Sequence, residues 1–368
     1  VLSAGQVLGG VSFGATVSLG AVLTADLSGN DALSGLAAAG VTLGAAAFAL
    51  PLAAFARRRG RRLALSTGML SALTGVVLVV LAAHLRVFPL LLVAFALIGA
   101  GQAANLQSRY AATDLSTQGS RGRDLSLVVW ATTVGAVLGP NLVGPGEQLG
   151  EAIGMPPLTG PYLFTAVAQV LAVTLYLVAL RPDPLPLAQK IVAARDNAAR
   201  RIQGADRPVA ARYAIIAIAG SHGIMVSVMA MTPVHLLHHG AALEIIGLTI
   251  SLHIAGMYAF APVFGMMADR IGRLPTIIVG QILLAASLVV AAVGAENSSA
   301  VTTALILLGL GWSGSTVAAS TLLTEASAEE FRTSRQGRGD LTMNLVGATG
   351  AIVAGVILGW IGYGGLAL

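Results

Sequence analysis

Cysteine is absent from this 368-residue chain, so the protein can form no disulfide bond, thiolate metal site or catalytic cysteine. Charge is also scarce, because Asp, Glu, Lys and Arg make up only 10% of the residues, against about a quarter in a soluble domain. Such a chain could not cover its own surface in water. The composition therefore excludes an ordinary soluble domain. With 56% hydrophobic residues and 45 glycines, it indicates helices that cross a membrane several times.

Long apolar runs confirm this class within the sequence itself. Each is long enough, at roughly 20 residues, to cross a bilayer as a helix. Eleven such runs lie at about 5–25, 32–55, 63–83, 88–112, 125–144, 161–180, 211–232, 244–264, 275–294, 300–323 and 341–361. Residues 366–368 read as the opening of a twelfth helix that the end of the sequence cuts off. We therefore expect an all-α polytopic membrane protein.

Basic residues gather in segments that alternate with the other loops. These segments hold 19 of the 21 Lys and Arg residues and lie at 56–62, 114–124, 181–212, 265–274 and 325–340. Because positive charge stays on the inner side of a membrane, we expect all five in the cytoplasm. The net charge of +5 then reports orientation, and nucleic acid is not an expected partner. One lysine against 20 arginines suggests high-GC codon usage and hence a bacterial cytoplasmic membrane.

The chain repeats itself at an offset of 212 residues. Residues 35–68 align with residues 247–280, so that the Gly-Arg pair at 60–61 falls on the pair at 272–273. The later segments GRDLSL (122–127) and GRGDLTM (337–343) also resemble each other. Two related six-helix halves explain these matches. We expect bundles at 1–180 and 212–368, joined by a cytoplasmic linker at 181–211 whose prolines interrupt it before a short amphipathic helix.

The segment GMMADRIGRLPTII (265–278) resembles the G-x-x-x-D-R-x-G-R signature of the major facilitator superfamily, which lies on the cytoplasmic loop between the second and third helix of a half. The resemblance implies two six-helix bundles, twelve helices in all, around a central cavity that opens alternately inward and outward. One departure stands out. The Asp of the signature is usually expected in the first half, where this chain has Arg57, whereas the second half has Asp269.

The signature also predicts a cytoplasmic gate. Asp269 can accept hydrogen bonds from the open N-terminus of a helix, which the family's pseudo-symmetry implies is the fifth, beginning near Asp124. Gly272 permits the tight turn, while Arg270 and Arg273 can pair with carboxylates or lipid phosphates.

By the same symmetry Arg57 faces the start of the eleventh helix, where Asp340 lies. The sequence thus predicts a charge-swapped gate between Arg57 and Asp340. The alternative is that these charges only anchor loops at the lipid surface.

A second segment, GAVLGPNLVGP (135–145), resembles the G-x-x-x-G-P-x-x-G-G element of the superfamily's exporters, with Val143 in place of one glycine. Its small residues would form a smooth helical stripe, and its proline allows a bend. The residues are Gly135, Gly139, Pro140 and Gly144. This element favours the branch of drug:proton antiporters, and ordinary tight helix packing is the alternative.

Proton coupling needs an ionisable group within the membrane, and no carboxylate falls at the midpoint of an expected span. His222 and His253 do, which makes them candidates for a proton relay. Neutral imidazoles bonded to a neighbouring helix are the alternative. Arg109, at an inner helix end, is expected to snorkel. The histidines of HLLHHG (235–240) read as interfacial rather than zinc-binding, so no metal site is expected.

Side chains on the spans that line the cavity in this family are substrate candidates. They are Gln102, Asn105, Met225, Met229, Trp312 and Thr316. The methionines lie on the helical face of His222, where packing is the alternative to a ligand pocket. The cavity is expected to be mainly apolar, which favours neutral or amphipathic organic substrates.

These observations predict a monomeric secondary active transporter in the lipid bilayer. We expect it to work by alternating access, to couple to protons, and to export a small hydrophobic or amphipathic compound. One alternative is a proton-coupled uptake permease for a metabolite or vitamin, and another is a non-transporting membrane sensor on the same fold. The sequence contains no P-loop and no intramembrane protease pattern, so neither an enzyme nor a cofactor is expected.

Overall fold

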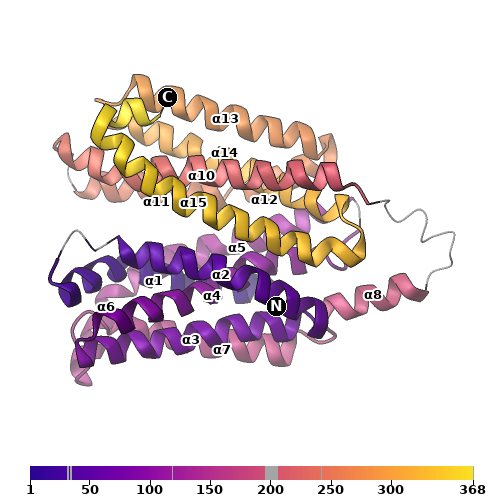
Figure 1. The fold of residues 1–368 in the computed structure, drawn as a ribbon, viewed down its shortest axis with the longest axis horizontal. Helices are drawn as coiled ribbons and strands as arrows, with labels where there is room; N and C mark the ends of the chain where they lie inside the picture. Colours follow the sequence, from indigo (N-terminus) through magenta and orange to yellow (C-terminus); the bar gives the residue numbers. More distant parts are fainter. Residues whose placement is uncertain (31–32, 34, 118, 195–205, 242, 368) are drawn as a thin grey trace. The chain divides into compact units, whose positions relative to one another are not determined.

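The computed structural model describes residues 1–30, 33, 35–117, 119–194, 206–241 and 243–367. Within these residues all regular secondary structure is helical (Figure 1). The description covers the backbone alone at 13, 15, 17, 18, 137, 140, 192–194, 237, 238, 243 and 244. The expected all-α fold is therefore confirmed.

The helices follow the apolar runs closely. In the first half of the chain they are α1 (Leu2–Ser28), α2 (Leu36–Arg59), α3 (Arg61–Leu85), α4 (Phe88–Ala111), α5 (Arg121–Asn141), α6 (Val143–Ala152), α7 (Pro161–Ala179) and α8 (Pro184–Ala194). In the second half they are α10 (Pro208–His238), α11 (Leu243–Tyr258), α12 (Ala261–Ile271), α13 (Arg273–Val293), α14 (Ser298–Ala326) and α15 (Glu329–Leu366).

Nine stretches of the described chain are long and apolar enough to cross a membrane, and each coincides with an expected run. The two remaining runs are helical as well, since α1 and α5 occupy them. The expectation of one continuous helix over 244–264 is wrong, because the helix ends at Tyr258 and a new one begins at Ala261. Pro262 lies in the first turn of the new helix and has no amide hydrogen with which to continue the old one.

Two further boundaries differ from the expected ones. The linker interrupts the helix after Ala179 as expected, but the next helix, α8, already begins at Pro184, and residues 195–204 of the expected amphipathic helix lie outside the described residues. At the other end of the chain, α15 begins at Glu329, twelve residues before the apolar run at 341–361. The reason is that several polar residues of its early turns, Thr333, Gln336 and Asp340, are buried in protein, so hydropathy does not mark them.

Contacts divide the chain into two compact units. Unit 1 contains Val1–Leu115, Ala131–Gln203 and Glu329–Leu341, and unit 2 contains Ser116–Trp130, Gly204–Ala328 and Thr342–Leu368. Each unit therefore includes the start of one helix from the opposite half of the sequence, namely α15 in unit 1 and α5 in unit 2.

The core of unit 1 forms around α4, which packs against α2 and α3, while α7 packs against α1 and α3. Figure 1 shows α3 and α7 side by side. Phe95, Leu91 and Val76 are fully or almost fully buried here. Glycine is required at Gly99, because a Cβ atom there would run into the carbonyl oxygen of Val41 on α2.

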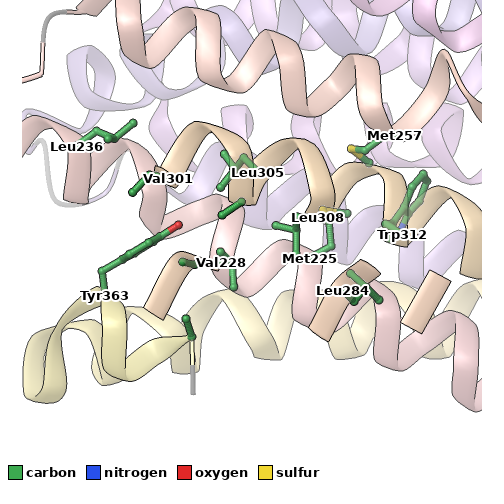
Figure 2. Close-up of a cluster of buried hydrophobic side chains, with 13 residues drawn as sticks. Met225, Val228, Leu236, Met257, Leu284, Val301, Leu305, Leu308, Trp312 and Tyr363 are labelled. Atoms are coloured by element: carbon green, nitrogen blue, oxygen red, sulfur yellow. The ribbon is translucent and has the colours of Figure 1, made fainter. Parts of the chain in front are cut away.

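The core of unit 2 forms around α14, which packs against α10, α11 and α13. Figure 2 shows the buried apolar side chains that these helices contribute, with Tyr363 of α15 beside them. Met225 points into this cluster from α10 and Trp312 from α14. Burial of such side chains supplies the packing that holds helices together in a membrane, where lipid is as apolar as leucine.

Candidate functional site

The first turn of α5 in unit 2 is capped by a carboxylate from α12. The backbone N–H of Gly122 donates to Oδ1 of Asp269 at 2.9 Å, and the N–H of Arg123 donates to Oδ2 at 2.9 Å. The first amides of a helix have no partner within it, and the helix dipole favours a negative charge at this end. The contact that the sequence predicts between Asp269 and the fifth helix is therefore present.

Two glycines allow α12 to come this close to α5. A Cβ atom on Gly122 would lie 2.6 Å from the carbonyl oxygen of Gly265, and one on Gly265 would meet Gly122 and the hydroxyl of Ser126. The signature's other glycine, Gly272, joins α12 to α13 with φ at 104°, a conformation that L side chains rarely adopt. Both glycine positions of the signature thus have a physical reason.

Arg273 ties this cap to α14. Its Nη2 lies 3.2 Å from Oδ1 of Asp269 and 2.6 Å from Oε1 of Glu325, and its Nε donates to Oε2 of Glu325 at 3.1 Å. A guanidinium that binds one carboxylate with two nitrogens fixes its geometry as well as its charge. Arg270, by contrast, is exposed at the end of α12.

Unit 1 contains a related but deeper ion pair. Arg61, the first residue of α3, donates through Nε and Nη2 to the two carboxylate oxygens of Asp114 at 2.9 and 3.2 Å. Its Nη2 also donates to Oε1 of Gln336 on α15 at 2.8 Å. The two ionised side chains are 1% and 0% exposed. Such a pair is costly to bury and costly to break, because the remaining charge would be left alone in protein.

The N-terminus of α3 is capped in the same way as that of α5. Asp183 accepts from the N–H of Arg61 at 3.1 Å and from the N–H of Arg62 at 2.8 Å. Sequence reasoning missed Asp183 and Asp114. The repeat contained a usable signal, since Arg61 aligns with Arg273, and Asp114 lies one position from the equivalent of Glu325.

A second buried pair corrects two expectations. Nη2 of Arg109 on α4 donates to Oδ1 of Asp340 on α15 at 2.6 Å, and the two side chains are buried. The predicted pair between Arg57 and Asp340 is wrong, because Arg57 is exposed on the last turn of α2. The expected snorkelling of Arg109 is also wrong, because a neighbouring carboxylate offers it a partner inside unit 1.

The intramembrane histidines both have hydrogen-bond partners. Nδ1 of His253 lies 2.8 Å from the carbonyl oxygen of Leu305, which can only accept, so the ring donates. Nδ1 of His222 accepts from Nε1 of Trp312 at 3.1 Å. For His253 this is the geometry of a neutral imidazole bonded to a neighbouring helix. A relay through either residue stays a prediction.

The histidines at the end of α10 serve helix packing. Nε2 of His235 bonds to the carbonyl oxygen of Ala295, and its ring stacks on Tyr363 at 4.2 Å. His239 bonds back to the backbone of His235, and the side chain of His238 lies outside the described residues. No group of three metal-ligating side chains occurs in the part of the chain that the structure describes.

Comparison with known proteins places this architecture. The sequence profile of the Major Facilitator Superfamily matches residues 2–246 and 214–368, which together span almost the whole chain. The chain belongs to the Major Facilitator Superfamily. It is 36% identical over 365 residues to the uncharacterized MFS-type transporter YddS of Bacillus subtilis, covering 97% of this chain and 84% of that protein. It is 31% identical over 374 residues to the riboflavin transporter RfnT of Brucella anthropi, covering 98% and 89%.

A solved structure shares the fold. The human organic anion transporter MFSD10 superposes with a TM-score of 0.75 at 16% identity, over 100% of this chain and 94% of that one. Together with the nine apolar spans, this confirms a membrane-spanning superfamily fold. The matches to the family profile and to YddS show that the chain belongs to a family of transporters.

Within the superfamily fold, the exporter-like element of α5 has a packing role. A Cβ atom on Gly135 would lie 2.7 Å from Cα of Gly10 on α1, so the glycine lets these two helices touch inside unit 1. Gly139 is buried, the helix ends at Asn141, and Gly144 is the second residue of α6. The side chain of Pro140 lies outside the described residues. An exporter role for this element stays a prediction.

The substrate candidates fall into two groups. Gln102 lines a small pocket in unit 1, together with Ser12 of α1 and Gln169 of α7. Asn105, one turn further along α4, is buried. In unit 2 the remaining four candidates take part in packing or lie buried beside it. Met225 and Trp312 belong to the buried cluster, Met229 packs against it, and Thr316 is 2% exposed.

Proposed function

We propose that this protein is a proton-coupled secondary transporter that works by alternating access and exports a small hydrophobic or amphipathic compound. The observation that supports alternating access most is the contact of Asp269 with the second and third amides of α5, those of Gly122 and Arg123. Asp269, Arg273 and Glu325 are partly accessible to solvent, so water can replace their bonds when the contact opens. This is the property that a reversible gate requires.

The same proposal includes the division of the protein into bundles at 1–180 and 212–368 with a linker at 181–211, a monomeric state, and location in the bacterial cytoplasmic membrane. It also places the basic loops inside the cell. The absence of cysteine makes this orientation easy to test. Arg58→Cys should be labelled by a membrane-impermeant maleimide only after the cells are opened, whereas Glu296→Cys should be labelled in intact cells. The opposite pattern would overturn the orientation.

A second candidate concerns the substrate and the direction of transport. The chain is 31% identical to a riboflavin transporter over almost its full length. Riboflavin is an amphipathic organic compound, and it therefore fits the expected apolar cavity as well as an exported compound would. The alternative function is thus a proton-coupled permease for a vitamin of this kind.

Flux in proteoliposomes separates these possibilities. The purified protein is reconstituted, and uptake of riboflavin and of a lipophilic dye is followed with a pH gradient, without one, and with a protonophore. We expect gradient-driven movement of at least one probe, with Asp269→Asn slower and Arg270→Gln unchanged. The sign of the gradient that drives accumulation distinguishes antiport from symport. Binding of a probe without flux under any gradient would instead support the sensor alternative.

A further inference from the structure

The buried ion pair between Arg109 on α4 and Asp340 on α15 has no role in the function proposed above. Asp340 lies in a helix that also contains a membrane span, and its side chain is 0% exposed. Its carboxylate is held by the guanidinium of Arg109 on α4. An ionisable group placed in this way is expensive and is a functional candidate by default.

The neighbouring ion pair provides an internal comparison. Arg61 binds both oxygens of Asp114 with two nitrogens. Arg61 is held further by Gln336, which accepts from its Nη2, and by Asp183, which accepts from the backbone N–H groups of Arg61 and Arg62. Arg109 reaches Asp340 with Nη2 alone, while its buried Nε makes no hydrogen bond within the described residues. The guanidinium also lies over the ring of Tyr110, 4.8 Å from its centroid. Arg61 therefore binds Asp114 through two nitrogens, whereas Arg109 binds Asp340 through one.

We propose that Asp340 is the carboxylate that carries the coupled proton, and that Arg109 is the positioning residue it releases on protonation. This rests on the proposed function, because it presumes a transporter driven by protons. The step is a simple proton transfer. A proton from the aqueous phase forms an O–H bond on Asp340, the N–H···O bond to Arg109 breaks, and the proton leaves to water when the pair forms again.

The charges around Asp340 are consistent with this assignment. From α4, Asp340 is bound by Arg109, which also donates to the phenol oxygen of Tyr110. One turn earlier on α15, Gln336 accepts from Arg61 of α3, and Asp114 balances the charge of Arg61. From α2, Gly337 of α15 meets the side chains of Ala53 and Leu50 and the carbonyl oxygen of Ala49. The three arginines at the end of α2 are exposed. Arg109 is thus the cation that donates a hydrogen bond to Asp340, and Arg61 adds a second positive charge that acts on it.

Protonation of Asp340 would weaken the contact between α4 and α15. Neutral Asp340 no longer balances Arg109, and an unpaired guanidinium inside protein must reach water or another anion. The start of α15 and the end of α4 would then separate within unit 1. Proton binding is thereby coupled to the release of a helix that continues into unit 2.

Infrared difference spectroscopy on the purified protein tests the site without any substrate. On acidification, the wild type should gain the carbonyl stretch of a buried protonated carboxyl. The band should disappear in Asp340→Asn and persist in Asp114→Asn. In Asp340→Glu it should shift, because the band then belongs to a glutamic acid. A band unchanged in either Asp340 variant would overturn the proposal, and the Glu variant decides if the Asn variant does not fold.

Flux measurements separate this proposal from the proposed function. The variant Arg109→Gln/Asp340→Asn carries no stranded charge, so it should exchange the probe that the wild type transports, riboflavin being the first tested. It should lose the acceleration that a pH gradient gives the wild type, and Asp340→Glu should keep it. A double variant as strongly gradient-driven as the wild type overturns the role of Asp340. A wild type that ignores the gradient overturns proton coupling itself.

Discussion

The two halves of the repeat contain the same ion pair in different surroundings. Arg61 binds Asp114 in unit 1, and its repeat equivalent Arg273 binds Glu325 in unit 2, each through Nε and Nη2. The side chains of the first pair are 1% and 0% exposed, whereas those of the second are 14% and 18% exposed. We call the buried pair of unit 1, Arg61 with Asp114, the dry pair, and the partly exposed pair of unit 2, Arg273 with Glu325, the wet pair.

The residue four positions before each arginine explains part of the difference. In unit 2 it is Asp269, which both receives Arg273 and caps α5. In unit 1 it is Arg57, which is positively charged and so cannot form an ion pair with Arg61, and which is exposed. The cap of α3 comes instead from Asp183. In unit 1 the two roles of Asp269 are thus divided between Asp114, which binds Arg61, and Asp183, which caps α3.

Breaking the dry pair should have the largest effect. In Asp114→Ala, Arg61 stays buried without its carboxylate, and loss of one partner of such a pair costs about 3–5 kcal/mol. We expect a strongly lowered melting temperature in detergent and poor yield. Glu325→Ala is the matched control, since its partner Arg273 reaches solvent. A larger loss in the control than in Asp114→Ala would refute the distinction between the two pairs.

Weakening the cap of α5 should have an intermediate effect. Asp269→Asn keeps an oxygen acceptor but removes the charge that favours the helix N-terminus, a change of about 1–2 kcal/mol. Hydrogen exchange at the amides of Gly122 and Arg123 should accelerate, while exchange at Arg61 and Arg62 stays as it is. Unchanged protection at Gly122 would show that Asp269 does not hold this helix.

The smallest expected effect is that of salt. Screening reaches partly exposed charges far more than buried ones. Raising the ionic strength should therefore reduce the stability difference between the wild type and Arg273→Gln, which we expect at about 0–1 kcal/mol. The difference between the wild type and Asp114→Ala should not respond. If both stability differences changed equally with ionic strength, the two ion pairs would be equally accessible to water.

The sequence alone could predict the fold and the contact of Asp269 with α5. Hydropathy located the spans because lipid demands apolar helices, and the repeat showed two related halves. Asp269 could be assigned because its partner is a helix N-terminus, which sequence marks through the turn before α5. What it could not show is the break at Ala259–Phe260, since an apolar run reads as one helix until Pro262 is considered.

The partners of the buried charges were beyond such reasoning for a physical reason. Hydropathy placed Asp340 outside the membrane, yet α15 begins at Glu329 and Asp340 is buried in protein. Arg109 has a polar head that could have turned toward solvent, and only the position of α15 decides that it turns inward. Pairing between residues more than two hundred positions apart depends on packing that one sequence does not display.

Two double-mutant cycles measure the central comparison most directly. One removes Arg61 and Asp114 singly and together, and the other does the same for Arg273 and Glu325, with the free energy of unfolding measured in the same detergent. We predict a clearly larger coupling energy for Arg61 with Asp114 than for Arg273 with Glu325, because water screens only the second pair. Equal coupling energies, or a larger one in unit 2, would contradict the account of a fixed brace in one half and a releasable contact in the other.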